Sequence, residues 1–92
     1  MIKNFKNWLI DNGYALFTKN NQPSTVYDYL LGVQYVCKWE NKTIDELAES
    51  ISEIYPKYCD MGEHSIRGRM KSRALRCGLK QFNKFIIESK GV

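Results

Sequence analysis

Residues 66–89 read IRGRMKSRALRCGLKQFNKFIIES, and this stretch contains both a hydrophobic face and a basic face. At 100° per residue, its apolar side chains fall on one arc of a helix. They are Met70, Ala74, Leu75, Cys77, Leu79, Phe82, Phe85 and Ile86. We therefore predict a single helix that begins between Ser65 and Arg69, at about residue 66, and ends near Ser89, where Gly91 follows as a stop signal.

The basic residues of the same stretch form one continuous stripe on a separate arc, over about four turns. The stripe consists of Arg69, Arg73, Arg76, Lys80 and Lys84. Like charges four residues apart repel each other, so the stripe opposes helix formation. Basic residues stabilise only the last turn of a helix, which accounts for Lys84 but not for Arg69 or Arg73. A bound polyanion explains the stripe better, and we interpret it as a nucleic-acid contact.

The first half of the chain predicts two more helices, at about residues 2–12 and 24–40. In the first, apolar side chains recur at three- and four-residue intervals, and Asn12-Gly13 provides a stop signal. In the second, an apolar stripe follows Ser24 or Thr25, either of which is a candidate N-cap. Gly32 lies inside this second helix, where we expect glycine to be tolerated only if another helix packs closely against it.

A further helix is predicted at about residues 43–56. Thr43 and Glu46 form a capping box, and Pro56 lacks a backbone donor, so this helix should end or bend near residue 55. Because no repeat and no strand-like alternation is present, we predict that residues 1–92 form a single all-α domain, a small four-helix bundle. Its expected core comprises Trp8, Tyr29, Leu30, Val33, Leu47, Ile51, Leu75, Leu79 and Phe82.

The net charge of +4 is unevenly distributed. Residues 1–39 carry four Lys against two Asp, a balance of +2, and residues 40–65 carry two Lys against seven acids, a balance of −5. Residues 66–92 carry eight Lys or Arg against one Glu, a balance of +7. So concentrated a basic segment indicates polyanion binding. The alternative is a solvated helix face that the acidic middle segment neutralises.

The composition, with 43% hydrophobic and 26% charged residues, is typical of a globular domain. No apolar run reaches the ~20 residues of a bilayer span, and no signal-peptide core follows Met1, so we expect a cytoplasmic chain without a membrane partner. The three cysteines are an odd number without a close pair, which favours reduced thiols. Because His64 is the only histidine, we expect no metal site, and we expect no cofactor.

Three segments together resemble the N-terminal core-binding domain of phage integrases, the tyrosine recombinases, whose small four-helix fold is called SAM-like. They are Phe5…Trp8-Leu9, then Ser24-Thr25-Val26…Tyr29-Leu30…Val33…Val36…Trp39, and finally Ser72-Arg73…Leu79-Lys80…Phe82…Phe85-Ile86. The similarity spans nearly the whole chain and rests mostly on apolar positions. Two residues depart from the family pattern: Val36 stands where an aromatic is usual, and Asp28 lies on the face of the second helix that can approach DNA in the family.

The resemblance implies a non-catalytic DNA-binding domain of a site-specific recombinase, one half of a clamp around duplex DNA, with a separate C-terminal catalytic domain as the other half. Helices two and four would approach the major groove. The DNA-binding residues would then be the basic stripe together with Ser24, Thr25, Gln34 and Lys38. Nothing in the chain matches the Arg, His and Tyr constellation of the catalytic domain, and no orienting group accompanies Cys59 and His64. We therefore expect no enzyme activity from this chain.

Two other functions are compatible with the sequence. A helix-turn-helix regulator would pair residues 44–55 with 66–88, but the intervening gap exceeds the usual turn of three or four residues. A small phage or mobile-element protein with the same fold would instead bind a host or phage protein. The basic stripe would then meet an acidic partner surface, and the anchors would be Tyr14, Leu16, Phe17 and Tyr27.

Overall fold

The computed structural model describes residues 1–15, 17, 19–20, 24–70 and 74–90 of the chain. These residues form helices, turns and loops, with no strand among them. The elements are α1 (Ile2–Asp11), α2 (Thr25–Trp39), α3 (Ile44–Ile54), the 3₁₀ helix η1 (Tyr55–Tyr58), α4 (Ser65–Gly68) and α5 (Ala74–Lys90). The all-α fold class predicted from the sequence is confirmed.

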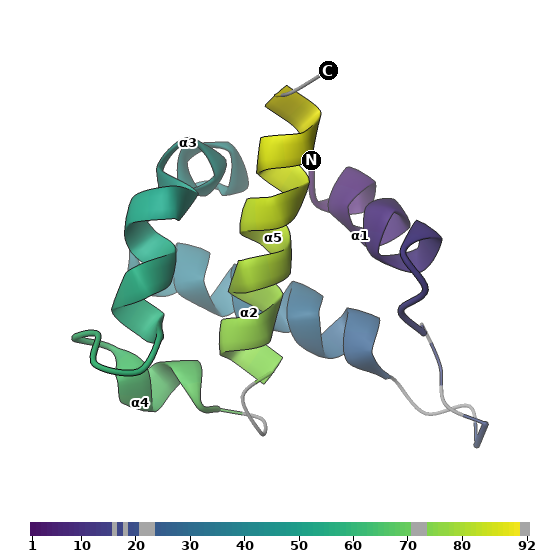
Figure 1. Ribbon diagram of the computed structural model, residues 1–92, viewed down its shortest axis with the longest axis horizontal. Helices are drawn as coiled ribbons and strands as arrows, with labels where there is room; N and C mark the ends of the chain where they lie inside the picture. The colour runs from purple at the N-terminus through teal and green to yellow at the C-terminus, as the bar shows by residue number, and fades with distance from the viewer. Residues whose placement is uncertain (16, 18, 21–23, 71–73, 91–92) are drawn as a thin grey trace.

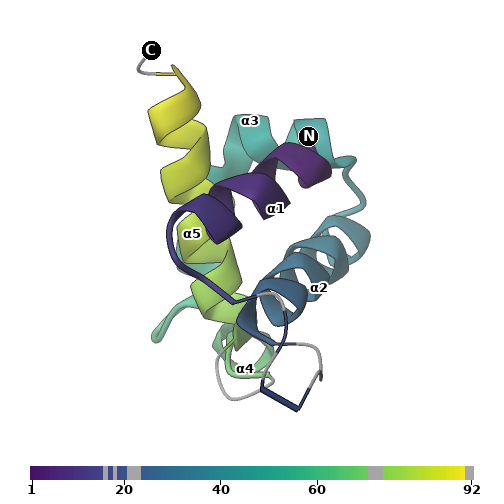
Figure 2. The same cartoon turned by 90° about the vertical axis from the view of Figure 1, so that its right-hand side faces the viewer.

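α5 is the central element, and the other helices pack around it (Figure 1). α2 crosses α5 and makes the most extensive contact with it, while α1 and α3 flank α5 on either side. A quarter turn shows α5 and α2 as two layers (Figure 2), in a molecule that measures 20 Å along its shortest axis. Each of these two helices therefore has one face against the other and one face directed outward.

Local sequence signals act as predicted at three helix ends. After Asn12, Gly13 adopts a φ of +93°, which ends α1 in a conformation that favours glycine. At the start of α3, the Thr43 hydroxyl accepts from the Glu46 N–H at 3.2 Å, and the Glu46 carboxylate accepts from the Thr43 N–H at 2.9 Å. Pro56 cannot continue the hydrogen bonding of α3, and the chain proceeds as η1.

A single hydrophobic core joins the long helices, and most of the predicted core residues belong to it. Trp8, Tyr29 and Leu30 are the exceptions, because they are only half-buried and pack at its edge. On α1 the inward positions are instead Phe5 and Leu9, and the Phe5 ring packs edge-on against Phe82 with 5.1 Å between centroids. The largest fully buried side chains are Tyr58, Phe5, Phe82, Leu9, Leu47, Leu75, Leu79, Val26, Val33 and Val36.

The structure corrects the prediction of one continuous helix over residues 66–89. α4 ends at Gly68, and α5 begins only at Ala74. A Cβ atom at residue 68 would overlap the carbonyl oxygen of Tyr58, so glycine is what lets α4 pack this closely on η1. α4 packs against η1, and Arg69 and Met70 after it form a turn instead of continuing the helix. The helical periodicity of the sequence continues through this region and does not reveal the break.

The break changes the positions of residues that the sequence assigned to one helix. Met70 is 41% exposed and is not part of the core, contrary to the predicted apolar arc. Arg69 lies in the turn after α4 and not on α5. The prediction for Arg73 falls outside the described residues, as does Ser72 of the family resemblance. The described part of the stripe on α5 is therefore Arg76, Lys80 and Lys84.

Two glycines let the backbones of α2 and α5 approach closely where these helices cross. A Cβ atom at Gly32 would lie 3.0 Å from the Cα of Leu75. A Cβ atom at Gly78 would lie 2.9 Å from the carbonyl oxygen of Tyr29. The expectation that another helix packs closely against Gly32 is confirmed, and the crossing sets which faces of the two helices point outward.

Candidate nucleic-acid interface

The outward face of α5 carries a row of cations, Arg76, Lys80 and Lys84, which we call the α5 row. These residues follow one another at four-residue intervals and so lie on successive turns of one face. Leu75 and Gly78 face α2, and a period of 3.6 residues places Lys80 on the side of α5 that points away from α2. Lys80 and Lys84 are exposed, whereas the side chain of Arg76 is only 18% exposed.

Asp60, in the loop after η1, connects Arg69 to the α5 row. Its Oδ1 atom accepts a hydrogen bond from Nη2 of Arg69 at 3.3 Å and lies 2.8 Å from Nη1 of Arg76. The hydrogen bond from Arg69 and the charge of Arg76 lower the pKa of the Asp60 carboxyl. Two residues of the predicted stripe are thus brought together by a carboxylate, although no continuous helix joins them. Sequence reasoning gave Asp60 no role, because no spacing rule links a loop residue to a helix that begins fourteen positions later.

The acidic middle segment neutralises only one end of this basic surface. Among the described residues, Asp60 pairs with Arg69 and Arg76, but no carboxylate oxygen lies within salt-bridge distance of Lys80 or Lys84. The exposed acids of α3, Asp45, Glu46, Glu49 and Glu53, are on a different element. The alternative interpretation, a solvated helix face neutralised by the acidic middle segment, therefore fits Arg69 and Arg76 better than it fits Lys80 and Lys84.

A pocket of about 420 Å³ opens beside the α5 row, between η1 and α5. It is lined by Tyr55, Cys59, Asp60, Arg76, Cys77 and Lys80. Burial, followed by a hydrogen bond with Cys59, raises the pKa of Tyr55 to about 12. The Tyr55 hydroxyl is therefore protonated throughout the physiological pH range. The pocket combines two cations, one hydroxyl and two thiols with a single carboxylate.

Gln34 and Lys38, two of the DNA-binding residues predicted on α2, are not on the same face as the α5 row. Gly32 faces α5, so Gln34, about 200° further round the helix, points away from α5. Lys38 lies one turn beyond Gln34 on the same face, and both residues are exposed. Ser24 is the N-cap of α2 and Thr25 its first residue, and both are half-buried. The outward faces of α2 and α5 point in opposite directions, as the two layers of Figure 2 indicate.

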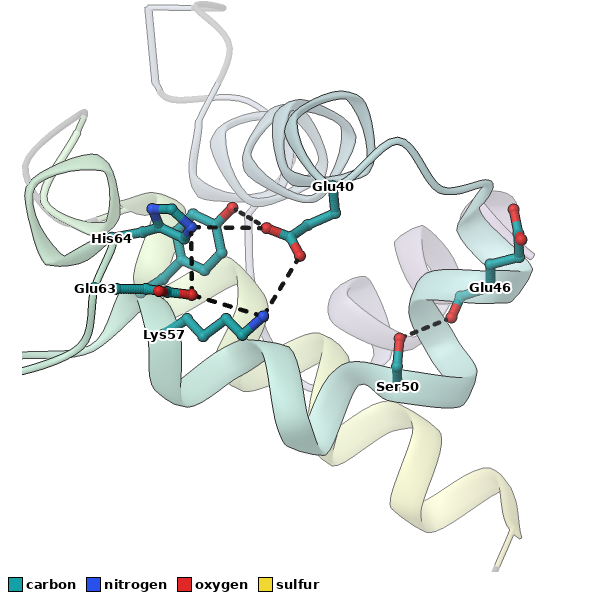
Figure 3. A network of polar contacts seen from close by, with 7 residues as sticks. Glu40, Glu46, Ser50, Lys57, Glu63 and His64 are labelled. Atoms are coloured by element: carbon teal, nitrogen blue, oxygen red, sulfur yellow. Dashed lines mark hydrogen bonds and ion pairs between the residues drawn. The ribbon is translucent and has the colours of Figure 1, made fainter.

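A polar network around Glu40, which sequence reasoning did not find, joins the end of α2 to η1 and α4 (Figure 3). Glu40 is 14% exposed, and its Oε2 atom accepts a hydrogen bond from the Tyr58 hydroxyl at 3.1 Å. Burial and the neighbouring Glu40 carboxylate raise the pKa of Tyr58. Nζ of Lys57 lies 4.0 Å from Oε1 of Glu40, and Nε2 of His64 lies 4.0 Å from its Oε2. These contacts place His64 in a structural network that holds η1 and α4 in position.

Arg67, the remaining described cation near α4, is engaged with an aromatic stack. Its guanidinium lies 4.8 Å from the centroid of the Trp39 ring, a cation–π contact. Trp39 also stacks on Tyr35 and on Tyr58, at centroid distances of 5.8 and 6.2 Å. Arg67 therefore contributes to the packing of α4 against the end of α2. Of the α5 row, Lys80 and Lys84 are the cations without a carboxylate partner among the described residues.

Comparisons with protein-family models, curated proteins and solved structures gave no match to this chain. Within the described ranges, no group of three or more His, Cys, Asp or Glu side chains is arranged to hold a metal ion. In the same ranges, no helix has the length and apolar character needed to cross a membrane.

Proposed function

We propose that this chain is a non-catalytic DNA-binding domain that holds duplex DNA against the outward face of α5. The observation that carries the proposal is the α5 row, whose two lysines have no carboxylate partner among the described residues. Cations aligned on one exposed face attract the phosphate backbone and release its condensed counterions. The resemblance to the core-binding domain of phage integrases supports the same function and adds a role in integration or recombination, with a separate catalytic domain as partner.

The α5 row supports affinity rather than recognition of a particular sequence. Lys and Arg side chains on phosphates position a protein on the duplex without reading its bases. With two to four phosphates neutralised, we expect non-specific binding with a Kd of about 1–100 μM at physiological salt. One half of a clamp also lacks the gain in effective concentration that a linked second domain supplies. Tight nanomolar binding of the isolated chain to one duplex would favour a self-sufficient regulator instead.

The proposal assigns α2 a smaller part than the family resemblance implies. Gln34 and Lys38 lie on the side of the molecule opposite the α5 row, in a structure 20 Å thick. A straight duplex resting on α5 does not reach that side. Lys38→Glu should therefore leave binding nearly unchanged if α5 forms the interface, and should weaken it if the duplex approaches α2.

The test is an electrophoretic mobility shift with random-sequence duplex DNA, repeated over a range of salt concentrations. For wild type we expect the logarithm of the binding constant to fall with the logarithm of salt at a slope of about −2 to −4. Lys80→Glu combined with Lys84→Glu should strongly weaken the low-salt shift and flatten the slope by about 2, since each phosphate contact contributes about 0.9. The matched control is Lys3→Glu combined with Lys19→Glu, which makes the same change in net charge at exposed positions outside α5.

Circular dichroism of all variants verifies that the helices persist. If the α5 variant binds DNA as wild type does, the row is only a solvated surface. If the control loses binding to the same extent, net charge rather than the α5 row determines affinity. Either result refutes the proposed interface.

A protein-binding role is the second candidate, and one observation favours it. The outward side of α2 and the loop before it expose apolar side chains, with Phe17 46%, Leu31 38% and Tyr35 38% exposed. Phe17 also pairs with Tyr27, with 5.7 Å between ring centroids. Exposed aromatic residues are frequent anchors of protein interfaces. Absence of any shift with duplex DNA at low salt would favour this role over DNA binding.

A further inference from the structure

One oxygen of Asp60 occupies the point where two guanidinium groups converge. Arg69 and Arg76 come from different elements, yet their nitrogens lie 3.3 and 2.8 Å from the same Oδ1 atom. Arginine side chains that converge in this way bind carboxylate and phosphate oxygens with similar geometry. The arrangement is therefore already shaped for an anionic oxygen.

The pocket between η1 and α5 extends this arrangement. Lys80 and Tyr55 line it together with Arg76, so an ammonium group and a phenolic hydroxyl border the same space as the guanidinium. The side chain of Arg76 is 18% exposed, so surrounding atoms hold it in place. Asp60 is 61% exposed and lies on a loop, so its carboxylate can turn into solvent at little cost.

We propose that this pocket binds one phosphate group of the DNA backbone, which replaces the Asp60 carboxylate between Arg69 and Arg76. The inference rests on the proposed DNA-binding function and assigns a particular site to one of its phosphate contacts. In the free protein, Asp60 keeps the two arginines oriented and partly neutralised. In the complex, the carboxylate swings out and the phosphate takes its place, with Lys80 beside it.

The deciding variant is Asp60→Asn, which keeps the size of the side chain and removes its charge. Exposed ion pairs contribute modestly, so we expect the affinity for duplex DNA to rise about two- to fivefold at low salt. Arg76→Gln should weaken binding and flatten the salt dependence by about 0.9, one phosphate contact. When Arg76→Gln is present, Asp60→Asn should give a smaller gain than it gives in wild type, because half of the paired charge is gone.

The matched control for Asp60→Asn is Glu49→Gln, which makes the same change in net charge on the exposed surface of α3. Its gain in affinity should be smaller, and it should be the same with or without Arg76→Gln. An equal gain in affinity from both substitutions would show that Asp60→Asn acts only through the net charge of the protein. Weaker binding by Asp60→Asn would show that the carboxylate supports the arginines in the complex. Either result overturns the inference while leaving the proposed function intact.

The cysteines provide a second measurement that needs no substitution. Cys59 and Cys77 line the pocket, and Cys37, on α2, does not. Duplex DNA should therefore slow alkylation of Cys59 and Cys77 by N-ethylmaleimide, with Cys37 as the internal control, as measured by mass spectrometry of peptides. Equal rates with and without bound DNA would overturn the inference.

The same labelling with inorganic phosphate separates this inference from the proposed function. If no duplex DNA binds, the proposed function fails, and phosphate alone then tests the pocket. Slower labelling of Cys59 and Cys77, but not Cys37, would support an anion site that takes free phosphate instead of DNA. Unchanged labelling of all three cysteines in saturating phosphate would reject the anion site as well.

Discussion

Replacing Gly78 with alanine has two opposing effects on stability. Alanine favours the helical conformation of α5, but its Cβ atom disturbs the close packing of α5 on α2. In an exposed helix interior, replacing glycine with alanine stabilises by about 1 kcal/mol. At residue 78, the added Cβ would lie 2.9 Å from the carbonyl oxygen and 3.0 Å from the Cα of Tyr29. Both are backbone atoms, so α2 itself must move away. Overpacking of this kind costs about 1–3 kcal/mol. We therefore expect the free energy of unfolding to fall by about 1 kcal/mol, the difference between about 2 from overpacking and about 1 from helix propensity.

Urea denaturation followed by far-ultraviolet circular dichroism measures this difference. The control is Ser52, exposed on α3, where the Ser52→Ala variant should be about 1 kcal/mol more stable than the Ser52→Gly variant. This pair gives the local preference for alanine in the same protein without a packing term. The Ser52→Ala and Ser52→Gly variants differ in their free energy of unfolding by the local preference for alanine alone. If Gly78→Ala raises the free energy of unfolding by that same amount, then α2 and α5 do not cross closely. The conclusion that the outward faces of α2 and α5 point in opposite directions would then no longer be supported.

Two further predictions concern the core and the arginine pair. Leu79→Ala removes a fully buried side chain and should lower the free energy of unfolding by about 2–5 kcal/mol, and an unmoved denaturation midpoint would contradict the core assignment. The Asp60 carboxyl should titrate in NMR below the ordinary pKa of aspartate, and Arg69→Gln should raise that value, because the hydrogen bond from Arg69 is the main cause of the shift. Since the folded pKa is the lower one, the stabilisation from Asp60 is present above the unfolded pKa and is lost as pH falls through the folded value. A titration unaffected by either arginine would exclude the pairing.

Short-range signals explain why much of the fold was predictable. The capping box of Thr43 and Glu46, the stop at Gly13 and the end of α3 before Pro56 depend on residues within one turn of each other. Such signals act through the backbone nearby and need no knowledge of the remaining chain. The apolar periodicity then indicated which side of each long helix faces the core.

The break between α4 and α5 shows where periodicity was insufficient. Apolar and basic residues keep a helical spacing from residue 66 onward, so a straight helix satisfies the pattern. α4 ends at Gly68, which packs on the carbonyl of Tyr58, a residue ten positions earlier on another element. Arg69, the next residue, lies in the turn after α4 and pairs with Asp60. No pattern within the helix records that contact.

The sequence by itself determined where most helices begin and end, and that positive charge is concentrated in the last third of the chain. It also determined the alignment of Arg76, Lys80 and Lys84, because residues four apart on one helix share a face whatever surrounds them. Only the tertiary structure decided that Gln34 and Lys38 face away from that row, and that Asp60 lies between Arg69 and Arg76. The physical reason is that helical periodicity relates residues within one helix, whereas the relative orientation of two helices depends on contacts such as Gly32 with Leu75, between residues far apart in the chain.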